Sequence, residues 1–291
     1  MSELFILKTK RICQLILMAS VLLMASRSFA NPWDPGSGNL GVTLLVGYDA
    51  SYFNLSTDNP SATVASGTMN GFYGELRGET EDYWSRLRAD YSTGSPAFSE
   101  AAPLLNPNLI GSSSQKILNV EGDLGAKALD SDRPLPATLT LYVGLGYRDW
   151  KNGFPMGTID FSSFYIPLGF NYIGRLKRLT FGIDGSLQVP FFTSTKLSES
   201  NGEPETSTSD INPDLGYRVE LPITYDVYKS DNAFWMEPRQ TKILLFLTPY
   251  WQYWKIPAWK ITYLDGTFAD SPAYITNTFG VLVGVGVNLD M

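Results

Sequence analysis

Pairs of carboxylates recur in this sequence, and a carboxylate pair is the minimum that an acid/base hydrolase needs. Glu121 and Asp123 lie two residues apart and would share one face of an extended strand, while Asp82 and Asp90 form a second candidate pair. The chain has no histidine, which excludes Ser–His triads, imidazole acid/base catalysis and His metal ligands. Because most such carboxylates are solvated or salt-bridged, we predict no enzymatic activity. A His-independent hydrolase is an alternative.

Charges of both signs also fall at alternate positions, on the side of the expected strands that is not apolar. If that side faces an enclosed space, two interpretations follow. We favour a network of ion pairs that fills and stiffens the interior, and the alternative is a narrow polar conduit lined by the same groups. The predicted inward charges are Glu75, Arg77, Arg86, Arg88, Asp90, Glu121, Asp123, Arg148, Asp184, Arg218, Glu220 and Asp226.

We predict no catalytic residue, metal site or cofactor. The only cysteine, Cys13, lies in a segment expected to be removed, so no thiolate or disulfide remains. Acids are frequent in Ser198–Asp214, but they lack the spacing of a calcium loop and predict a solvated loop. The segment Asp231–Thr241 contains Phe234 and Trp235, for which we expect packing at a membrane interface, with contact to a periplasmic partner as the alternative.

The elements that must position these side chains are strands, because the hydrophobic period along the chain is two. In Ala137–Arg148, for example, Leu139, Leu141 and Val143 alternate with small or polar residues. We predict ten strands: Leu40–Phe53, Met69–Arg77, Tyr83–Tyr91, Gln115–Ala126, Ala137–Arg148, Ser162–Tyr172, Leu179–Val189, Leu215–Val227, Thr241–Trp254 and Thr278–Met291.

In the five clearest strands the apolar face carries no Asp, Glu, Lys or Arg, whereas the other face is small, polar or charged. A soluble sandwich would bury the apolar face, but a lipid-facing barrel turns it outward around a crowded polar interior. Glycine on the polar face favours the barrel, since inward side chains would collide there: Gly144, Gly146, Gly169, Gly182, Gly216, Gly280, Gly284 and Gly286. Pro167 and Pro222 fit neither alternative well, because proline removes a ladder donor.

Connections after odd-numbered strands are long, and those after even-numbered strands are shorter, as in bacterial outer-membrane barrels. The predicted fold is therefore all-β, a ten-stranded antiparallel up-and-down transmembrane β-barrel. In strand count and length the chain resembles omptins, the ten-stranded outer-membrane proteases, through its architecture alone. That family uses a His–Asp and an Asp–Asp pair. The absence of histidine means that the resemblance implies no such activity here.

Residues 1–30 have the features of a cleaved signal peptide, and we expect the barrel to comprise residues 31–291. Lys8, Lys10 and Arg11 precede the apolar run Ile12–Met24, and small residues at 28 and 30 suggest cleavage before Asn31. The run is shorter than the roughly twenty residues of a membrane helix. We therefore predict export to the outer membrane of a Gram-negative bacterium.

For function, we predict a structural or surface-interaction role through long extracellular loops, with a narrow porin-like channel for small solutes as the alternative. Expected partners are outer-membrane lipid, the barrel-assembly machinery during insertion and an unidentified extracellular ligand bound by the loops. The chain has a net charge of −7, which argues against nucleic acid as a partner.

Overall fold

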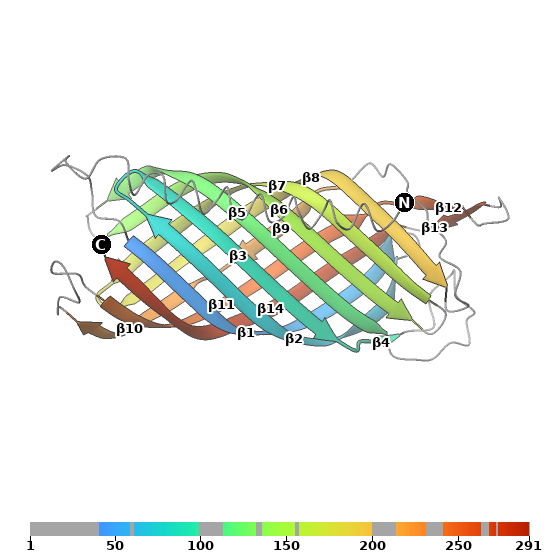
Figure 1. Ribbon diagram of the computed structural model, residues 1–291, viewed down its shortest axis with the longest axis horizontal. Helices are drawn as coiled ribbons and strands as arrows, with labels where there is room; N and C mark the ends of the chain where they lie inside the picture. Colours follow the sequence, from blue (N-terminus) through green and yellow to red (C-terminus); the bar gives the residue numbers. More distant parts are fainter. Residues whose placement is uncertain are drawn as a thin grey trace, which may run out of the picture.

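The chain folds into one closed antiparallel barrel (Figure 1). The computed structural model describes residues 41–58, 61–98, 113–131, 136–154, 157–199, 214–230, 241–262, 268–271 and 273–290. The expected signal peptide lies outside these residues. No helix among them is both long and apolar enough to cross a membrane. The strands are β1 (Gly41–Asp58), β2 (Ser61–Glu79), β3 (Tyr83–Gly94), β4 (Ala97–Phe98), β5 (Ser114–Ser131), β6 (Ala137–Phe154), β7 (Gly157–Leu176), β8 (Leu179–Glu199), β9 (Gly216–Glu220), β10 (Ile223–Ser230), β11 (Thr241–Ile256), β12 (Trp259–Thr262), β13 (Phe268–Ser271) and β14 (Tyr274–Asp290).

Ten positions make up the wall of the described barrel, as the sequence predicted. Strands β9 and β10 share one position because both pair with β8 and β11 in a single register, and β4 continues β3 along β2. Each wall strand is antiparallel to its neighbours, and β1 pairs with both β2 and β14, which closes the sheet. A closed sheet has no free edge, so its backbone groups are paired within the wall.

The strands extend further than the alternating pattern predicted. Only residues 59–60 separate β1 from β2, and only residues 155–156 separate β6 from β7. The expectation of five long loops is therefore wrong at these two connections. A third connection carries the hairpin of β12 and β13, which projects past the barrel (Figure 1). We call this end of the barrel the loop end, and the opposite end, where β14 finishes, the turn end.

Apolar side chains face outward and most charged side chains face the lumen, as predicted. Leu141 of β6 is 55% exposed, and Val283, in the middle of β14, is 47% exposed. On the opposite face, Asp184 is 3% exposed and Arg218 is 2% exposed. This is the reverse of a soluble sandwich, in which the apolar faces would meet in the interior.

Inward glycines make room for aromatic rings from the neighbouring strand. A Cβ at Gly146 of β6 would lie 2.1 Å from the ring of Tyr165 of β7, and a Cβ at Gly169 of β7 would lie 2.4 Å from the ring of Tyr142 of β6. The two strands thus exchange an aromatic ring for a glycine in both directions. The rings cover backbone that would otherwise face the lumen, a recognised way to stabilise glycine in a sheet.

The interior is not uniformly polar, which corrects the sequence-based description. At the loop end an apolar cluster fills the lumen, formed by Phe53, Leu55, Val64, Ala65, Met69, Ile117, Trp150, Ile159, Phe161, Ile256 and Tyr274. A smaller cluster contains Leu45, Tyr73, Leu244, Phe246, Tyr250 and Leu282. We call the first the loop-end core. Its inward residues are apolar, so alternation fades there, which explains why the strand ends were predicted too short.

The strand prolines are accommodated by local changes in the ladder. Between β6 and β7 the pairing stops at Val143–Leu168 and resumes at Gly146–Tyr165, so that Pro167 faces a gap in the ladder. Around Pro222 the neighbouring bonds are kept, because its carbonyl accepts from Gly182 N at 2.9 Å and Pro249 O accepts from Leu221 N at 2.9 Å. The wall therefore stays closed at both prolines.

Candidate functional site

Most of the predicted inward charges meet in the lumen, on the turn-end side of the loop-end core. Of the twelve, Asp90 is 6% exposed, Asp226 is half-buried, the side chain of Arg77 is 20% exposed, and the other nine are at most 3% exposed. All except Asp226 of β10 come from β2, β3, β5, β6, β8 and β9. We call these residues and their polar contacts the lumen network. The alternating pattern placed each of them on the correct face.

Arg86 binds three carboxylates from two other strands. Its Nε donates to Asp123 Oδ2 and its Nη1 to Asp184 Oδ2, both at 2.8 Å, while Nη2 lies 3.4 Å from Glu121 Oε1. The guanidinium carbon is 5.0 Å from the ring centroids of both Trp84 and Tyr142. A planar guanidinium suits this role, because its three nitrogens donate in fixed directions, whereas a lysine donates from a single nitrogen.

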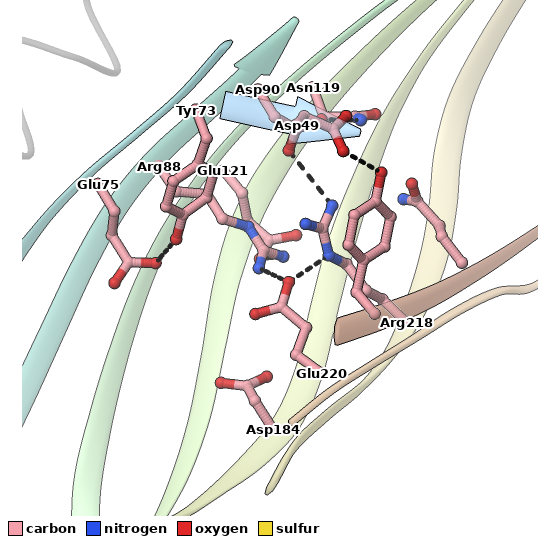
Figure 2. Close-up of polar contacts among 12 residues, drawn as sticks. Asp49, Tyr73, Glu75, Arg88, Asp90, Asn119, Glu121, Asp184, Arg218 and Glu220 are labelled. Carbon is pink, nitrogen blue, oxygen red and sulfur yellow. Dashed lines mark hydrogen bonds and ion pairs between the residues drawn. The ribbon is translucent and has the colours of Figure 1, made fainter. Parts of the chain in front are cut away.

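A chain of ion pairs continues from this centre across the lumen (Figure 2). Arg88 donates through Nη2 to Glu121 and through Nη1 to Glu220 Oε1 at 2.8 Å. Glu220 also accepts from Arg218 Nε, and Arg218 Nη1 lies 3.2 Å from Asp90 Oδ1. Since β3 and β9 are not adjacent in the wall, these bonds join opposite sides of the barrel.

Arg148 has a different environment, made of amides instead of carboxylates. Its Nη1 donates to Asn119 Oδ1 at 3.0 Å and lies 3.2 Å from Gln252 Oε1, and the guanidinium carbon lies 5.2 Å from the ring of Trp254. Asn119 in turn donates to Asp90 Oδ2 at 2.6 Å. The asparagine thus links the positive charge of Arg148 to the nearest carboxylate.

Glu75 and Arg77 form an outlying pair nearer the turn end, and Tyr73 donates its hydroxyl proton to Glu75. Asp226, which the sequence also placed inward, is half-buried and belongs to none of the ion pairs described above. The network therefore has a dense centre and a smaller outlying part.

Several members of the network, three tyrosines and Asp49, were not predicted from the sequence. Tyr165 donates to Glu121 Oε2 at 2.9 Å, Tyr142 to Asp184 Oδ1 at 2.6 Å, and Tyr250 to Asp49 Oδ1 at 2.9 Å. All of these lie at inward positions of their strands. Their position in the alternating pattern was the available signal. However, tyrosine occurs on both the lipid-facing and the lumen-facing side of a membrane barrel, so the residue type does not show which way it points.

Neither carboxylate pair proposed for hydrolysis survives as an isolated pair. Asp82 is exposed at the turn before β3, whereas Asp90 is buried eight residues later, about 26 Å along an extended strand. Glu121 and Asp123 do share a face, but arginines hold both. No group of three metal-ligating side chains occurs in the described part of the chain. Residues 200–213 and 231–240, which hold most of the acidic loop and the Phe234–Trp235 segment, lie outside it.

No family model and no curated protein matches this chain. Among solved structures, the outer membrane protease OmpT from Escherichia coli matches with a TM-score of 0.42 and 8% identity, over 90% of this chain and 99% of the other. The translocator domain of the autotransporter NalP from Neisseria meningitidis matches with a TM-score of 0.36 and 10% identity, over 94% and 97%. Neisserial surface protein A matches with a TM-score of 0.29 and 12% identity, over 85% and 97%. This chain is like them in barrel architecture, and no function is transferred from them.

Proposed function

We propose that this protein is a bacterial outer-membrane β-barrel with a sealed lumen, and that it acts without catalysis, through structural support and surface interaction at its loop end. One observation carries the proposal: the wall is apolar outside, while a lumen network of buried ion pairs spans the inside. In water this arrangement would expose the apolar face and bury the charges, and both are unfavourable. In a bilayer the same faces are satisfied.

Outward aromatic side chains support a membrane boundary. Within each of two groups, neighbouring ring centroids lie 4.9 to 6.4 Å apart. One group spans β6 to β8 and the other spans β9 to β14: Tyr147, Phe164, Phe191 and Phe192; and Tyr217, Tyr253, Trp251 and Phe279. Tyrosine and tryptophan concentrate where hydrocarbon meets headgroups. We call this series the aromatic belt.

Charged side chains appear on the outer wall just beyond the aromatic belt. Lys151 is paired across strands with Lys116 on one side and Asp160 on the other, and Asp160 is paired with Lys196. Lys151 lies four residues past Tyr147, about 13 Å along the strand. The change from apolar to charged residues at one level supports a hydrocarbon boundary there, with the loop end outside it.

The sealed lumen is favoured over the porin-like alternative because two successive layers fill it. The lumen network joins opposite walls of the barrel. The loop-end core lies between this network and the loop end, and its residues Phe53 and Leu55 are completely buried. Ten strands enclose little more space than eight, whose interior side chains nearly fill a barrel. A solute would therefore have to displace both ion pairs and packed apolar side chains.

The loop end is the surface that we assign to interaction, because the β12–β13 hairpin projects from it. Both strands of this hairpin have an unpaired edge within the described sheet, and such edges can pair with an extended segment of another chain. An extracellular ligand bound there, together with membrane lipid and the assembly machinery that inserts barrels, completes the proposed set of partners.

Fractionation and planar-bilayer recordings test the proposal together. We expect the protein in the outer-membrane fraction, with faster gel mobility before boiling than after, and no stepwise current after reconstitution. Recovery in the soluble fraction with unchanged mobility would refute the membrane assignment. Regular stepwise currents from the folded protein would instead establish the channel alternative. A variant in which residues 257–273 are replaced by a Gly-Ser linker should stay folded but lose binding in a glycan array, and unchanged binding would exclude the hairpin.

A further inference from the structure

Three lysines lie close together on the outer wall of the barrel, beyond the aromatic belt. Lys116 of β5 is directly opposite Lys151 of β6, and Asp160 of β7 separates Lys151 from Lys196 of β8. These four side chains face outward, because buried inward residues adjoin each of them along its strand. We call Lys116, Lys151 and Lys196 the lysine patch.

The direct opposition of Lys116 and Lys151 is unfavourable by itself. Opposed residues of an antiparallel pair hold their Cβ atoms about 5 Å apart, and like charges at such positions destabilise a sheet. Both side chains are exposed, and neither forms an ion pair or a hydrogen bond with another described residue. A negative group seated between the two ammonium groups would turn this repulsion into attraction.

The two carboxylates on the same surface leave the lysine patch with an excess of positive charge. Asp160 lies between Lys151 and Lys196 but pairs with neither, and its Oδ1 has no hydrogen-bond partner. Asp149 lies two residues before Lys151 on the same face, and it also forms no ion pair in the described part of the chain. Three cations thus face two anions, and none of the five is tied to another.

A lysine at the same level elsewhere in the wall is neutralised by the protein. Lys255 of β11 lies four residues beyond Trp251 of the aromatic belt, and its Nζ is 2.9 Å from Asp58 Oδ2 and 3.3 Å from Asp214 Oδ2. The chain therefore supplies counter-charges to one outward lysine of this level. For the lysine patch, the counter-charge has to come from outside the described chain.

The level of the lysine patch is that of lipid headgroups. Lys151 lies four residues beyond Tyr147, and Lys196 lies four residues beyond Phe192, which is about 13 Å along each strand. Aromatic side chains mark the boundary between hydrocarbon and headgroups. Long lysine side chains at this depth reach the polar region, where the phosphate groups of lipids are found.

We propose that the lysine patch binds the phosphate group of an anionic lipid in the leaflet at the loop end. The inference rests on the proposed function, because a lipid reaches this surface only if the barrel lies in a membrane. An ammonium group binds phosphate oxygen as a point charge with three donors. A phosphate between Lys116 and Lys151, with Lys196 beside it, would neutralise the excess charge. A metal cation would be repelled by the same lysines.

Lipid binding to the folded barrel in a neutral detergent tests the lysine patch. The probe is phosphatidic acid, with phosphatidylcholine of the same acyl chains as the zwitterionic comparison, and affinities come from competition with fluorescent phosphatidic acid. The wild type should prefer phosphatidic acid at least about tenfold. One basic residue near an anionic lipid surface is worth about fivefold in affinity, so the double variant Lys116→Gln/Lys151→Gln should lose about 25-fold.

Two single variants separate the lysine patch from general charge effects. Lys255→Gln is the matched control, since it removes the same charge at the same level from a lysine that Asp58 and Asp214 already neutralise; affinity should change less than about twofold. Asp160→Asn removes a carboxylate beside two lysines and should strengthen binding about fivefold. A purely structural role of these residues would not produce such a gain.

Equal affinity of the wild type for phosphatidic acid and phosphatidylcholine would overturn the proposal. An equal loss from Lys255→Gln and from Lys151→Gln would also overturn it, because the effect would then follow net charge alone. Inorganic phosphate that displaces the fluorescent lipid as effectively as phosphatidic acid would exclude a lipid as the occupant. Gel mobility reports the folding of each variant, and fractionation tests the membrane assignment separately, so a failure here differs from a failure of the proposed function.

Discussion

Replacing Arg86 by methionine should be among the most destabilising single changes in the barrel. Arg86 is 1% exposed and bonds two carboxylates at 2.8 Å, with a third 3.4 Å away. Methionine keeps much of the apolar volume of the side chain but removes every bond. Glu121 would retain Arg88, whereas Asp123 would lose the one arginine that it contacts in the described chain.

The expected cost follows from the charges left behind. Removing one partner of a buried ion pair costs about 3–5 kcal/mol, mostly because the other charge stays buried and unpaired. Asp184 keeps the hydroxyl of Tyr142 at 2.6 Å and the amide of Asn171 at 2.9 Å, which limits its share. We therefore expect a loss of about 4 kcal/mol in the free energy of unfolding, or roughly a thousandfold in the folding equilibrium constant.

Reversible urea unfolding in lipid vesicles, followed by tryptophan fluorescence, measures this loss. Arg175→Met is the matched control, because Arg175 is exposed beside the β7–β8 turn and should change stability by less than about 0.5 kcal/mol. Adding Asp123→Asn to Arg86→Met should recover part of the loss by removing a stranded charge. A loss below about 1 kcal/mol for Arg86→Met would refute the view that the network is held by this arginine.

Three further changes test other layers of the barrel. Trp150→Ala should cost about 3–5 kcal/mol in urea unfolding, because Trp150 is 1% exposed in the loop-end core and donates to Gln115 Oε1 at 2.6 Å; a cost near zero would mean that this core is not packed. Gly146→Ala should lower the free energy of unfolding by about 1–3 kcal/mol, because the added methyl group overlaps the Tyr165 ring. This cost should be smaller in a Tyr165→Ala background, and a double variant whose cost equals the sum of the two single costs would contradict the contact. Leu145→Arg, at the outward midpoint of β6, should cost about 2–4 kcal/mol in vesicles, whereas Leu129→Arg near the turn end should cost about 0–1 kcal/mol. Equal costs would argue against a bilayer around the barrel.

Strand number, strand order and the direction of each face could be read from the sequence. Alternation is a local property, since successive side chains of a strand point to opposite sides. Residues such as Leu141 and Arg218 therefore carry their own orientation, and the structure confirms both. The pattern failed where both faces are apolar, as at Phe53 and Trp150, so the strand ends and two short connections were mispredicted.

The partners of each charge were beyond the reach of the sequence. Arg86 and Asp184 are 98 residues apart, and Arg88 and Glu220 are 132 residues apart. Closure of the sheet alone brings these strands face to face across the lumen. Asp49 has the inward parity of its strand, opposite to Leu44 and Tyr48, but its bond to Tyr250, 201 residues away, could not be read from the sequence.

The order of residues thus determined that this chain forms a barrel with apolar side chains outside and charges inside, because each strand encodes its two faces locally. Only the tertiary structure decided which charges pair, that Tyr250 bonds Asp49, and that apolar side chains close the loop end. Those features depend on distances across the lumen, and these distances are set by the number, tilt and register of all the strands together.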